Sequence, residues 1–487
     1  MRTTPVSLAC TADRTSTITA EIDRLVEEAD IPAAFPAEVL RAAEQAAAQS
    51  LSTTDRADLR AIPFLTLDPA ASTDLDQAMH LERTADGWVV RYAIADVPFF
   101  VTIGDPVDQE AHRRGTTIYL PDRRIPLHPE VLSEDTASLL PGQDRPAFVW
   151  TMTLDADGRV QNTQLERALV RSREKLGYDQ VQQDLDAGSG HPMMVLLQEL
   201  GTLRIARESE RGGASLVMPE QEAQVQDGRI CMQWRTLHPI ESANAQISLM
   251  TGMAAAEMML RAKQGILRTL PPADEESIRR FRLQSRALGI EWPKGQRYGD
   301  FLRTLDWTQP HHLALLNQAG SLFRGAGYLI LNEDTDPQDA HQAAIGAPYA
   351  HVTAPLRRLA DRFALLVCAL ISSGTSIPAQ LQTALEELPE IMASTTRAAS
   401  GLEKAALDRV ELHVLAERVG EEFPATVISL REGEKPRAEV QLVDPSVTLW
   451  VEGKWLSGPH ALELGTVVTL RLSAVDLHAG TVDLQPA

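Results

Sequence analysis

Three carboxylates follow a short apolar run within one stretch of nine residues. The run, residues 62–67, is typical of a β-strand, and Asp68, Asp74 and Asp76 come directly after it. Pro69 bends the chain behind Asp68, while Asp74 and Asp76 point to one face of an extended segment because they are two residues apart. The fold must therefore gather negative oxygens at the end of a strand. Such a cluster favours a cation, Mg²⁺ or Mn²⁺; a solvated acidic turn is the alternative.

The composition limits the class of protein. The chain has 487 residues, enough for about three domains at ~150 residues each. No apolar run reaches the ~18 residues of a membrane span and no signal peptide is visible, so we expect no membrane association. Three widely spaced cysteines favour a reducing, cytoplasmic location. The net charge of −21 argues against a general polyanion-binding surface, but basic residues could still line a channel.

The N-terminal residues predict two helices. Residues 1–15 show no regular pattern, and apolar residues at helical spacing predict helices over 16–30 and 37–49. The pair resembles a helical hairpin or a helix-turn-helix. Because Arg41 is the only basic residue of the second helix, a packing role is favoured over DNA reading.

The middle of the chain alternates strands and helices. We expect a core strand over 88–95 that ends at Asp96, with Asp96 as a strand-end cap rather than a neighbour of the ligands. A hairpin is predicted around residues 157–158 and another around 227–228. Helices are predicted over 177–186, 192–210 and 239–263, and they dominate 274–332. Tyr119 lies beside basic residues and could stack on a base or pack in the core.

A basic segment lies in the second half of the chain. Pro355 favours the first turn of a helix, so Arg357 and Arg358 would lie near a helix N-terminus. Two guanidiniums at a helix N-terminus form a phosphate site. A surface salt-bridge pair is the alternative.

The last 65 residues have a different pattern. Five short β-like runs at 423–430, 437–443, 447–451, 466–475 and 480–484 predict a Greek-key barrel of the oligonucleotide-binding kind. Charged and stacking side chains accompany them: Arg431, Lys435, Arg437, Trp450, Lys454 and Trp455. RNA is the favoured ligand, although such barrels also bind sugars or proteins.

In combination, these stretches resemble the ribonuclease II (RNB) family. Four segments occur in the family's order: the acidic stretch after residue 67, and residues 92–96, 119–127 and 353–361. The last 65 residues resemble the family's S1 domain. The resemblance implies an α+β fold with three parts: a helical N-terminal segment (1–60), an RNB catalytic domain with a mixed sheet and surrounding helices (61–418), and an S1 barrel (419–487). It also implies a short bacterial form without the N-terminal cold-shock domains.

The same resemblance implies an activity. It is processive hydrolysis of single-stranded RNA from the 3′ end, with release of nucleoside 5′-monophosphates; we also expect entry into duplexes that carry a 3′ overhang. RNA is the expected partner, and no obligate protein partner is evident.

The resemblance also implies roles for single residues. Asp68, Asp74 and Asp76 occupy acidic metal positions, and Gln77 stands where the family has a fourth aspartate. Asp76 would orient the attacking water, and Arg357 would brace the phosphate. Tyr119 would stack on the 3′-terminal nucleotide, and Glu403 would contact a base. We also predict that Arg358 and Trp450 bind RNA.

Two other functions stay open at this stage. Because Gln77 carries no charge, the chain could be an RNA-binding protein with lost or weak catalysis. A DNA-binding regulator built on the N-terminal helices would instead bind a specific duplex sequence.

Overall fold

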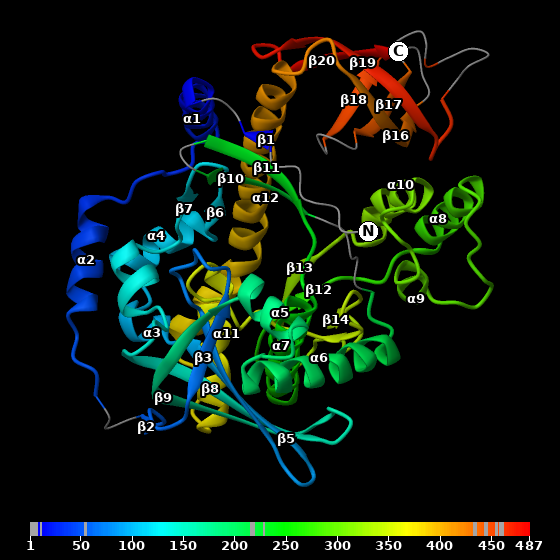
Figure 1. The fold of residues 1–487 in the computed structure, drawn as a ribbon. Helices are drawn as coiled ribbons and strands as arrows, with labels where there is room; N and C mark the ends of the chain where they lie inside the picture. Colours follow the sequence, from blue (N-terminus) through cyan, green and yellow to red (C-terminus); the bar gives the residue numbers. More distant parts are fainter. Residues whose placement is uncertain are drawn as a thin grey trace.

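The structure is a computed structural model that describes residues 8–9, 12–52, 56–214, 220–226, 229–431, 436–442, 447–452, 456 and 462–487 (Figure 1). The turn predicted at 227–228 lies outside these residues, as do Lys435, Lys454 and Trp455. None of the helices in this described part of the chain is both long and apolar enough to span a bilayer.

A mixed sheet forms the centre of the molecule, as predicted. Its strands are β2 (Ala57–Asp58), β3 (Phe64–Asp68), β4 (Gln77–Arg83), β5 (Gly87–Ala95), β8 (Asp144–Asp155) and β9 (Val160–Gly177). The order is β2-β9-β3-β4-β5-β8, and β9 also pairs with β8. The first part of β9 forms an antiparallel hairpin with β8, whereas its end runs parallel to β3. The sheet therefore closes on itself, and Asp68 lies beside Gly177 at one end of this closed sheet.

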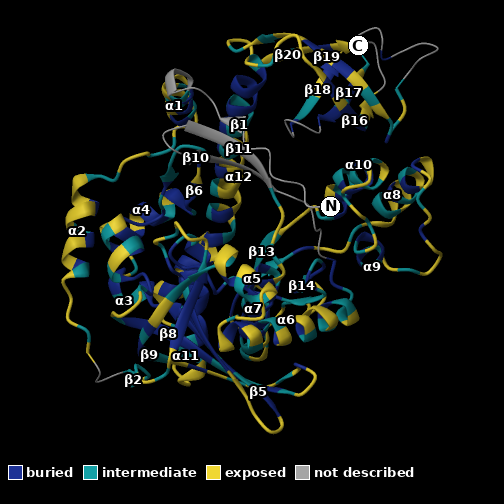
Figure 2. Ribbon diagram, in the orientation of Figure 1, coloured by how far each residue is buried: buried dark blue, intermediate teal, exposed yellow. Residues whose placement is uncertain are grey.

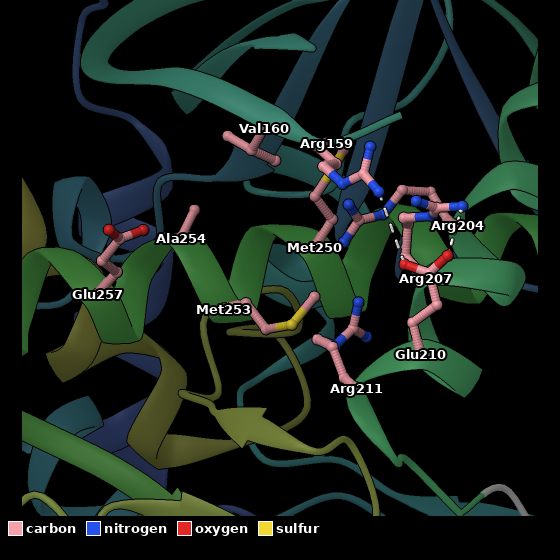
Figure 3. Close-up of a pocket in the computed structure, with 10 residues that line it drawn as sticks. All are labelled: Arg159, Val160, Arg204, Arg207, Glu210, Arg211, Met250, Met253, Ala254 and Glu257. Atoms are coloured by element: carbon pink, nitrogen blue, oxygen red, sulfur yellow. Dashed lines mark ion pairs between the residues drawn. The ribbon is translucent and has the colours of Figure 1, made fainter. Parts of the chain in front are cut away.

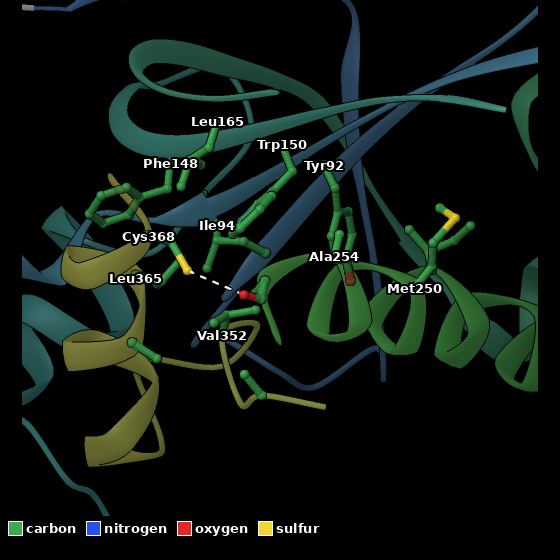
Figure 4. Close-up of a cluster of buried hydrophobic side chains, with 14 of the residues drawn as sticks. Tyr92, Ile94, Phe148, Trp150, Leu165, Met250, Ala254, Val352, Leu365 and Cys368 are labelled. Atoms are coloured by element: carbon green, nitrogen blue, oxygen red, sulfur yellow. Dashed lines mark hydrogen bonds between the residues drawn. The ribbon is translucent and has the colours of Figure 1, made fainter. Parts of the chain in front are cut away.

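The main hydrophobic core lies between this sheet and two helices, α7 (Pro239–Ala262) and α11 (Leu359–Ser372) (Figure 4). Tyr92, Phe148 and Trp150 are each fully buried there. Figure 2 shows the sheet as the most continuously buried part of the fold. At about 1.5–3 kcal/mol for each large apolar side chain, this burial keeps the strand that leads into the acidic stretch in place.

Helices and short strands surround the sheet. The helices are α3 (Val97–Phe100), α4 (Pro106–Arg114), a π-helix (Val131–Thr136), α5 (Tyr178–Asp186), α6 (Pro192–Arg211), α8 (Glu275–Ala287), α9 (Tyr298–Leu302), α10 (Pro310–Ala319), a 3₁₀ turn (Gly320–Leu322) and α12 (Ala379–Ala416). The short strands are β1 (Leu8–Ala9), β6 (Ile118–Tyr119), β7 (Arg124–Ile125), β10 (Glu220–Gln226), β11 (Arg229–Arg235), β12 (Gly265–Thr269), β13 (Gly327–Leu331), β14 (His341–Gln342) and β15 (Ala347–Pro348).

The predictions for this region hold with one difference. Helices α5, α6 and α7 begin and end within one residue of the predicted limits, and β8 and β9 form the predicted hairpin. Residues 327–331, however, are a strand, β13, where helix was expected, because they pair with β12.

Both N-terminal helices are present, as α1 (Ala12–Glu28) and α2 (Ala37–Ala47). Helix α1 begins four residues before the predicted start, because its first turn is polar and shows no apolar period. Helix α1 packs Ile18, Ile22 and Val26 against α12, whereas α2 packs against α4 and the π-helix. The two apolar faces thus cover separate parts of the body, which favours the packing interpretation.

The C-terminal residues form the predicted five-stranded barrel. Its strands are β16 (Glu422–Arg431), β17 (Arg437–Leu442), β18 (Thr448–Glu452), β19 (Val467–Asp476) and β20 (Thr481–Pro486). All pairs are antiparallel, in the order β18-β17-β16-β19-β20, and β18 approaches β20. This is the strand arrangement of an oligonucleotide-binding barrel. Helix α10 packs against β16, so the barrel is joined to the helical group α8–α10.

The helix predicted to begin at Pro355 begins four residues later, so that prediction is wrong. The N–H groups of Arg357 and Arg358 bond to the Ala354 carbonyl in a turn, and Leu359 starts α11. Arg358 also forms a β-bridge with Thr116. Pairing with this distant segment outweighs the local preference of Pro355, and Arg357 therefore precedes the helix.

Candidate active site

The acidic stretch is a loop between β3 and β4 that distant side chains hold in place. The Ser138 hydroxyl accepts a hydrogen bond from the Leu75 N–H (2.9 Å) and donates one to the Thr73 carbonyl (2.7 Å). Lys175, near the end of β9, donates to two further loop carbonyls, each at 2.6 Å. The loop conformation therefore depends on residues 63 to 105 positions away in sequence.

Two of the three aspartates are withdrawn from water. Asp76 is 4% exposed, and its Oδ1 accepts a hydrogen bond from the Leu356 N–H (2.7 Å). Burial raises the pKa of Asp76 well above its usual value, in spite of the nearby Arg357. Burial, and then the charge of Asp74, raise the pKa of Asp68 to about 7. The Asp68 Oδ2 is buried and has no hydrogen-bond partner among the described residues.

Asp74 has a different environment, because it binds a guanidinium. Arg124 donates to Asp74 Oδ1 (2.8 Å) and to the Thr73 hydroxyl (2.6 Å), and it also pairs with Glu134. Sequence reasoning missed Arg124. Its only signal was its place near Tyr119, and nothing in a separation of 50 residues connects it with Asp74.

The donor set suits a hard cation, although it is not assembled as a cage. Within the described residues, no three His, Cys, Asp or Glu side chains form a ready metal site. Asp68 nonetheless has a buried oxygen without a hydrogen-bond partner, and the pKa values of Asp68 and Asp76 are raised. A bound cation would stabilise the ionised form of both carboxylates. The side chains present thus fit Mg²⁺ or Mn²⁺ in kind.

Gln77 is the first residue of β4, and its side-chain amide donates a hydrogen bond to the Thr353 carbonyl. The amide nitrogen therefore ties the acidic loop to the basic segment. A metal contact through its oxygen stays a prediction.

The two adjacent arginines have different environments. Arg357 is 43% exposed, and its Nε lies 3.7 Å from Asp76 Oδ2. Arg358 donates two hydrogen bonds to Asp361, at 2.9 and 2.8 Å, and Asp361 also accepts from the Ala354 N–H. Burial raises the pKa of Asp361, but the Arg358 guanidinium outweighs it and the net shift is downward. Arg357 thus faces solvent beside the acidic loop, while Arg358 has a protein partner.

Tyr119 and Glu403 lie together beside the acidic loop. The Tyr119 N–H donates to Glu403 Oε1 (2.9 Å), which joins β6 to α12. Tyr119 pairs with Arg124, which binds Asp74, so Tyr119 lies near the acidic loop. Partial burial and then the charge of Asp74 raise the pKa of Tyr119. The ring is 47% exposed, which makes the core interpretation wrong and leaves a face for a ligand.

Trp450 belongs to the barrel rather than to this site. It lies on β18, is 37% exposed, and has the guanidinium of Arg431 at 4.5 Å from its ring centroid. Its predicted contact with RNA stays a prediction.

Asp96 is not the strand-end cap that the sequence favours. It is fully buried and accepts two hydrogen bonds from Arg167 (2.9 and 2.7 Å) and one from Arg56 (3.0 Å). Its side chain makes no cap bond to α3. Asp96 is thus a buried ion-pair centre, because two arginines far away in sequence converge on it.

Comparison with known protein families gives a match to the RNB domain over residues 56–370, well over half of the chain. The chain belongs to the RNB family. A second match, to the RNase II-type exonuclease C-terminal S1 domain, covers residues 421–487. The RNB match contains the three aspartates, Arg357 and Tyr119, whereas the S1 match contains Trp450.

RNB relatives extend over more than this chain. Ribonuclease R of Escherichia coli is 31% identical over 328 residues, which is 63% of this chain and 39% of that protein. Among solved structures, Mycoplasma genitalium RNase R has the same fold: its complex with ribose-methylated single-stranded RNA gives a TM-score of 0.87 at 20% identity, covering 96% of this chain and 78% of that one. Its complex with double-stranded RNA gives 0.84 at 21% identity, with 96% and 83% covered.

The RNB fold also occurs without catalysis. Yeast Ssd1, described as a pseudonuclease, gives a TM-score of 0.70 at 17% identity and covers 94% of this chain and 59% of its own. The RNB fold by itself therefore does not establish the activity.

Proposed function

We propose that this chain is a metal-dependent hydrolytic 3′→5′ exoribonuclease of the cytoplasm. It would degrade single-stranded RNA processively and release nucleoside 5′-monophosphates. The observation that supports this most directly is the contact between Asp76 and the half-exposed Arg357, beside the unpartnered oxygen of Asp68. A carboxylate pair and an accessible guanidinium at one place are what hydrolysis of a phosphodiester needs.

Each residue has a distinct part in this proposal. Asp68 and Asp76, together with Asp74 and Gln77, would hold Mg²⁺ or Mn²⁺. The bound cation would make water a stronger nucleophile and stabilise charge on the phosphate. Asp76 would accept or orient the proton of that water. Arg357 would meet the charge that develops on the phosphate oxygens.

Binding of the RNA would use the surfaces around this centre. The half-exposed Tyr119 would stack on the terminal base. The Glu403 carboxylate holds strand β6 in place by accepting a hydrogen bond from the Tyr119 N–H. The barrel, with Trp450, would bind the strand further upstream. The structures of M. genitalium RNase R with single- and double-stranded RNA support RNA as the substrate class. We propose that duplexes with a 3′ overhang are also entered.

The direct test is hydrolysis of a 5′-end-labelled single-stranded RNA with Mg²⁺, with Mn²⁺ and with a chelator. A processive 3′→5′ enzyme leaves one short labelled product without a ladder of intermediates, and chromatography shows nucleoside 5′-monophosphates. A duplex with a 3′ overhang, run beside it, tests entry into the stem. Internal cleavage, or activity that the chelator leaves unchanged, would contradict the proposal.

A second candidate is RNA binding without catalysis. Two contacts favour this candidate, because Asp74 is bonded to Arg124 and the Gln77 amide to the Thr353 carbonyl. The similarity to the pseudonuclease Ssd1 also favours it. It predicts that RNA is retained on a filter with Mg²⁺ while its length stays constant.

Gln77→Asp is expected to lower the Mg²⁺ concentration for half-maximal activity by about threefold or more, because it adds a charged oxygen beside Asp76. It also removes the amide that donates to Thr353. Gln77→Ala is the matched control, since it removes the amide without adding charge. Identical metal titrations for Gln77→Asp and wild type would place residue 77 outside the metal site.

Arg357→Ala is expected to lower turnover by about 10²-fold, the usual effect of losing one donor to a developing charge, with a small change in KM. Single-turnover and steady-state kinetics measure the two effects separately. Arg357→Lys keeps the positive charge and is expected to recover part of the rate. If KM rises as much as turnover falls, Arg357 only anchors the phosphate.

Tyr119→Ala is expected to lengthen the shortest product by one or more nucleotides, because stacking of one base contributes ~1–3 kcal/mol. A sequencing gel of end-labelled RNA measures the product length. Tyr119→Phe keeps the ring and serves as the control. An unchanged end product would mean that the ring does not hold the terminal base.

A further inference from the structure

A cavity of about 300 Å³ is lined by residues outside the acidic loop (Figure 3). It is bounded by the turn between β8 and β9, by α6 and by α7. Its lining residues are Arg159, Val160, Arg204, Arg207, Glu210, Arg211, Met250, Met253, Ala254 and Glu257. None of these residues has a part in the proposed hydrolysis, so the cavity needs a separate explanation.

Three arginines of α6 line one side of the cavity, because their spacing of three and four residues places them on one helix face. Arg204 is 4% exposed and donates one hydrogen bond to the Gly158 carbonyl (2.8 Å). Its Nε, the Nε of Arg207 and the Nη2 of Arg211 are buried without a hydrogen-bond partner among the described residues. A buried charged donor without an acceptor destabilises the fold, because it has lost its hydrogen bonds to water.

The carboxylates of the cavity do not balance its guanidiniums. Glu210 pairs with Arg207 (2.8 Å) and more distantly with Arg159 (3.8 Å). The other carboxylate, Glu257, pairs with Arg261, outside the lining. Among the lining residues, Glu210 is thus the carboxylate that pairs with the guanidiniums, while Glu208, behind the lining, also acts on Arg211.

The environment of Arg204 shows the same excess of positive charge. Burial lowers the pKa of Arg204 to about 10, and the neighbouring charges of Arg211 and Arg207 add to this shift. An anion between these side chains would relieve their mutual repulsion.

The side of the cavity formed by α7 is mainly apolar, with Glu257 at its edge. Met250, Met253 and Ala254 of α7 line it, with Val160 at the start of β9. Methionine side chains adapt to flat or irregular ligands and make favourable contacts with aromatic rings. The cavity therefore combines an anion-binding face with an apolar wall.

We propose that this cavity binds a small phosphomonoester, with the phosphate at the arginines and the organic part on the methionine wall. Guanidiniums bind phosphate through paired, charge-assisted hydrogen bonds, and those of Arg204, Arg207 and Arg211 line the cavity. A volume of about 300 Å³ is at the lower end for small-molecule sites, which suits a mononucleotide or a sugar phosphate rather than a polymer. The proposal is independent of the proposed hydrolysis.

Isothermal titration calorimetry of the full chain in EDTA tests the proposal, since a chelator keeps metal out of the acidic loop. The probes are adenosine 5′-monophosphate, ribose 5-phosphate, inorganic phosphate and adenosine. We expect one site that binds the two phosphomonoesters, with adenosine weaker by about tenfold or more, equivalent to ~1.4 kcal/mol. The ratio of the first two affinities then shows whether the base or the sugar phosphate is recognised.

Four variants locate the site. Arg207→Gln and Arg211→Gln should each weaken binding of the phosphomonoesters by about tenfold, the loss of one charge-assisted contact. Arg280→Gln, on the exposed face of α8, is the matched control, and Arg357→Gln reports any binding at the acidic loop. Thermal melting of each variant shows that the fold is kept.

Four results would overturn the proposal. The first is the absence of binding by any phosphorylated probe. The second is equal affinity for adenosine. The third is binding that Arg357→Gln weakens and the α6 variants do not. The fourth is weaker binding of a short RNA by the α6 variants while their affinity for the phosphomonoesters stays unchanged. The arginines would then contact a polymer instead of a small molecule.

Discussion

The Asp76→Asn variant is expected to lose hydrolysis by at least about 10³-fold, equivalent to ~4 kcal/mol of barrier. Asp76 is the buried carboxylate nearest to Arg357, and it is the residue that we propose to orient the attacking water. An asparagine oxygen can still accept the hydrogen bond from the Leu356 N–H, so the loop should keep its conformation. What disappears is the negative charge and the ability to accept a proton.

Single-turnover hydrolysis and RNA binding, measured on the same preparation, check this expectation. Binding should stay equal or become tighter, because one charge that repels the phosphates is removed. Asp334→Asn, at an exposed position, is the matched control with the same change of charge. A variant that keeps more than about a tenth of the activity, a loss of less than ~1.4 kcal/mol, removes Asp76 from the catalytic role.

The Arg358→Ala variant is expected to lower the free energy of unfolding by about 3–5 kcal/mol, because it leaves the buried Asp361 without its positive partner. Asp361 is fully buried, and Arg358 donates two hydrogen bonds to it. The same carboxylate holds the Ala354 N–H, so the turn that presents Arg357 also depends on this pair. Activity should therefore fall together with the folded fraction.

Urea unfolding monitored by fluorescence and circular dichroism measures this change. Arg357→Ala is the control on the adjacent residue. It removes a half-exposed side chain with one ion-pair distance of 3.7 Å and should cost at most about 1 kcal/mol. Equal stability for Arg358→Ala and wild type would mean that the Arg358–Asp361 pair does not stabilise the fold and that Arg358 is free to bind RNA.

Local sequence patterns predicted the elements of the fold well where the signal is itself local. Helices α6 and α7 begin at prolines, which favour the first helical turn. The hairpin of β8 and β9 follows from the turn at residues 157–158, and the five barrel strands follow from their alternation and turns. Each of these signals lies within about ten residues of the structure that it predicts.

The candidate site is only partly a local property. The sequence by itself placed three aspartates behind a strand and two arginines behind a proline, and it indicated the RNB family through their order. It could not show that Arg124 binds Asp74, nor that Arg358 binds Asp361 while Arg357 stays accessible. It also could not place the arginines of α6 in a common cavity with α7.

The tertiary structure decided these points for a physical reason. Hydrogen bonds and ion pairs depend on distances in space, and burial determines how strongly a charge needs a partner. The start of α11 illustrates this, because pairing of Arg358 with Thr116 moved it from Pro355 to Leu359. The sequence determined which chemical groups the chain carries and which secondary structures they favour. Only the closed sheet and the helices around it decided which charges meet, which are buried, and which stay open to a ligand.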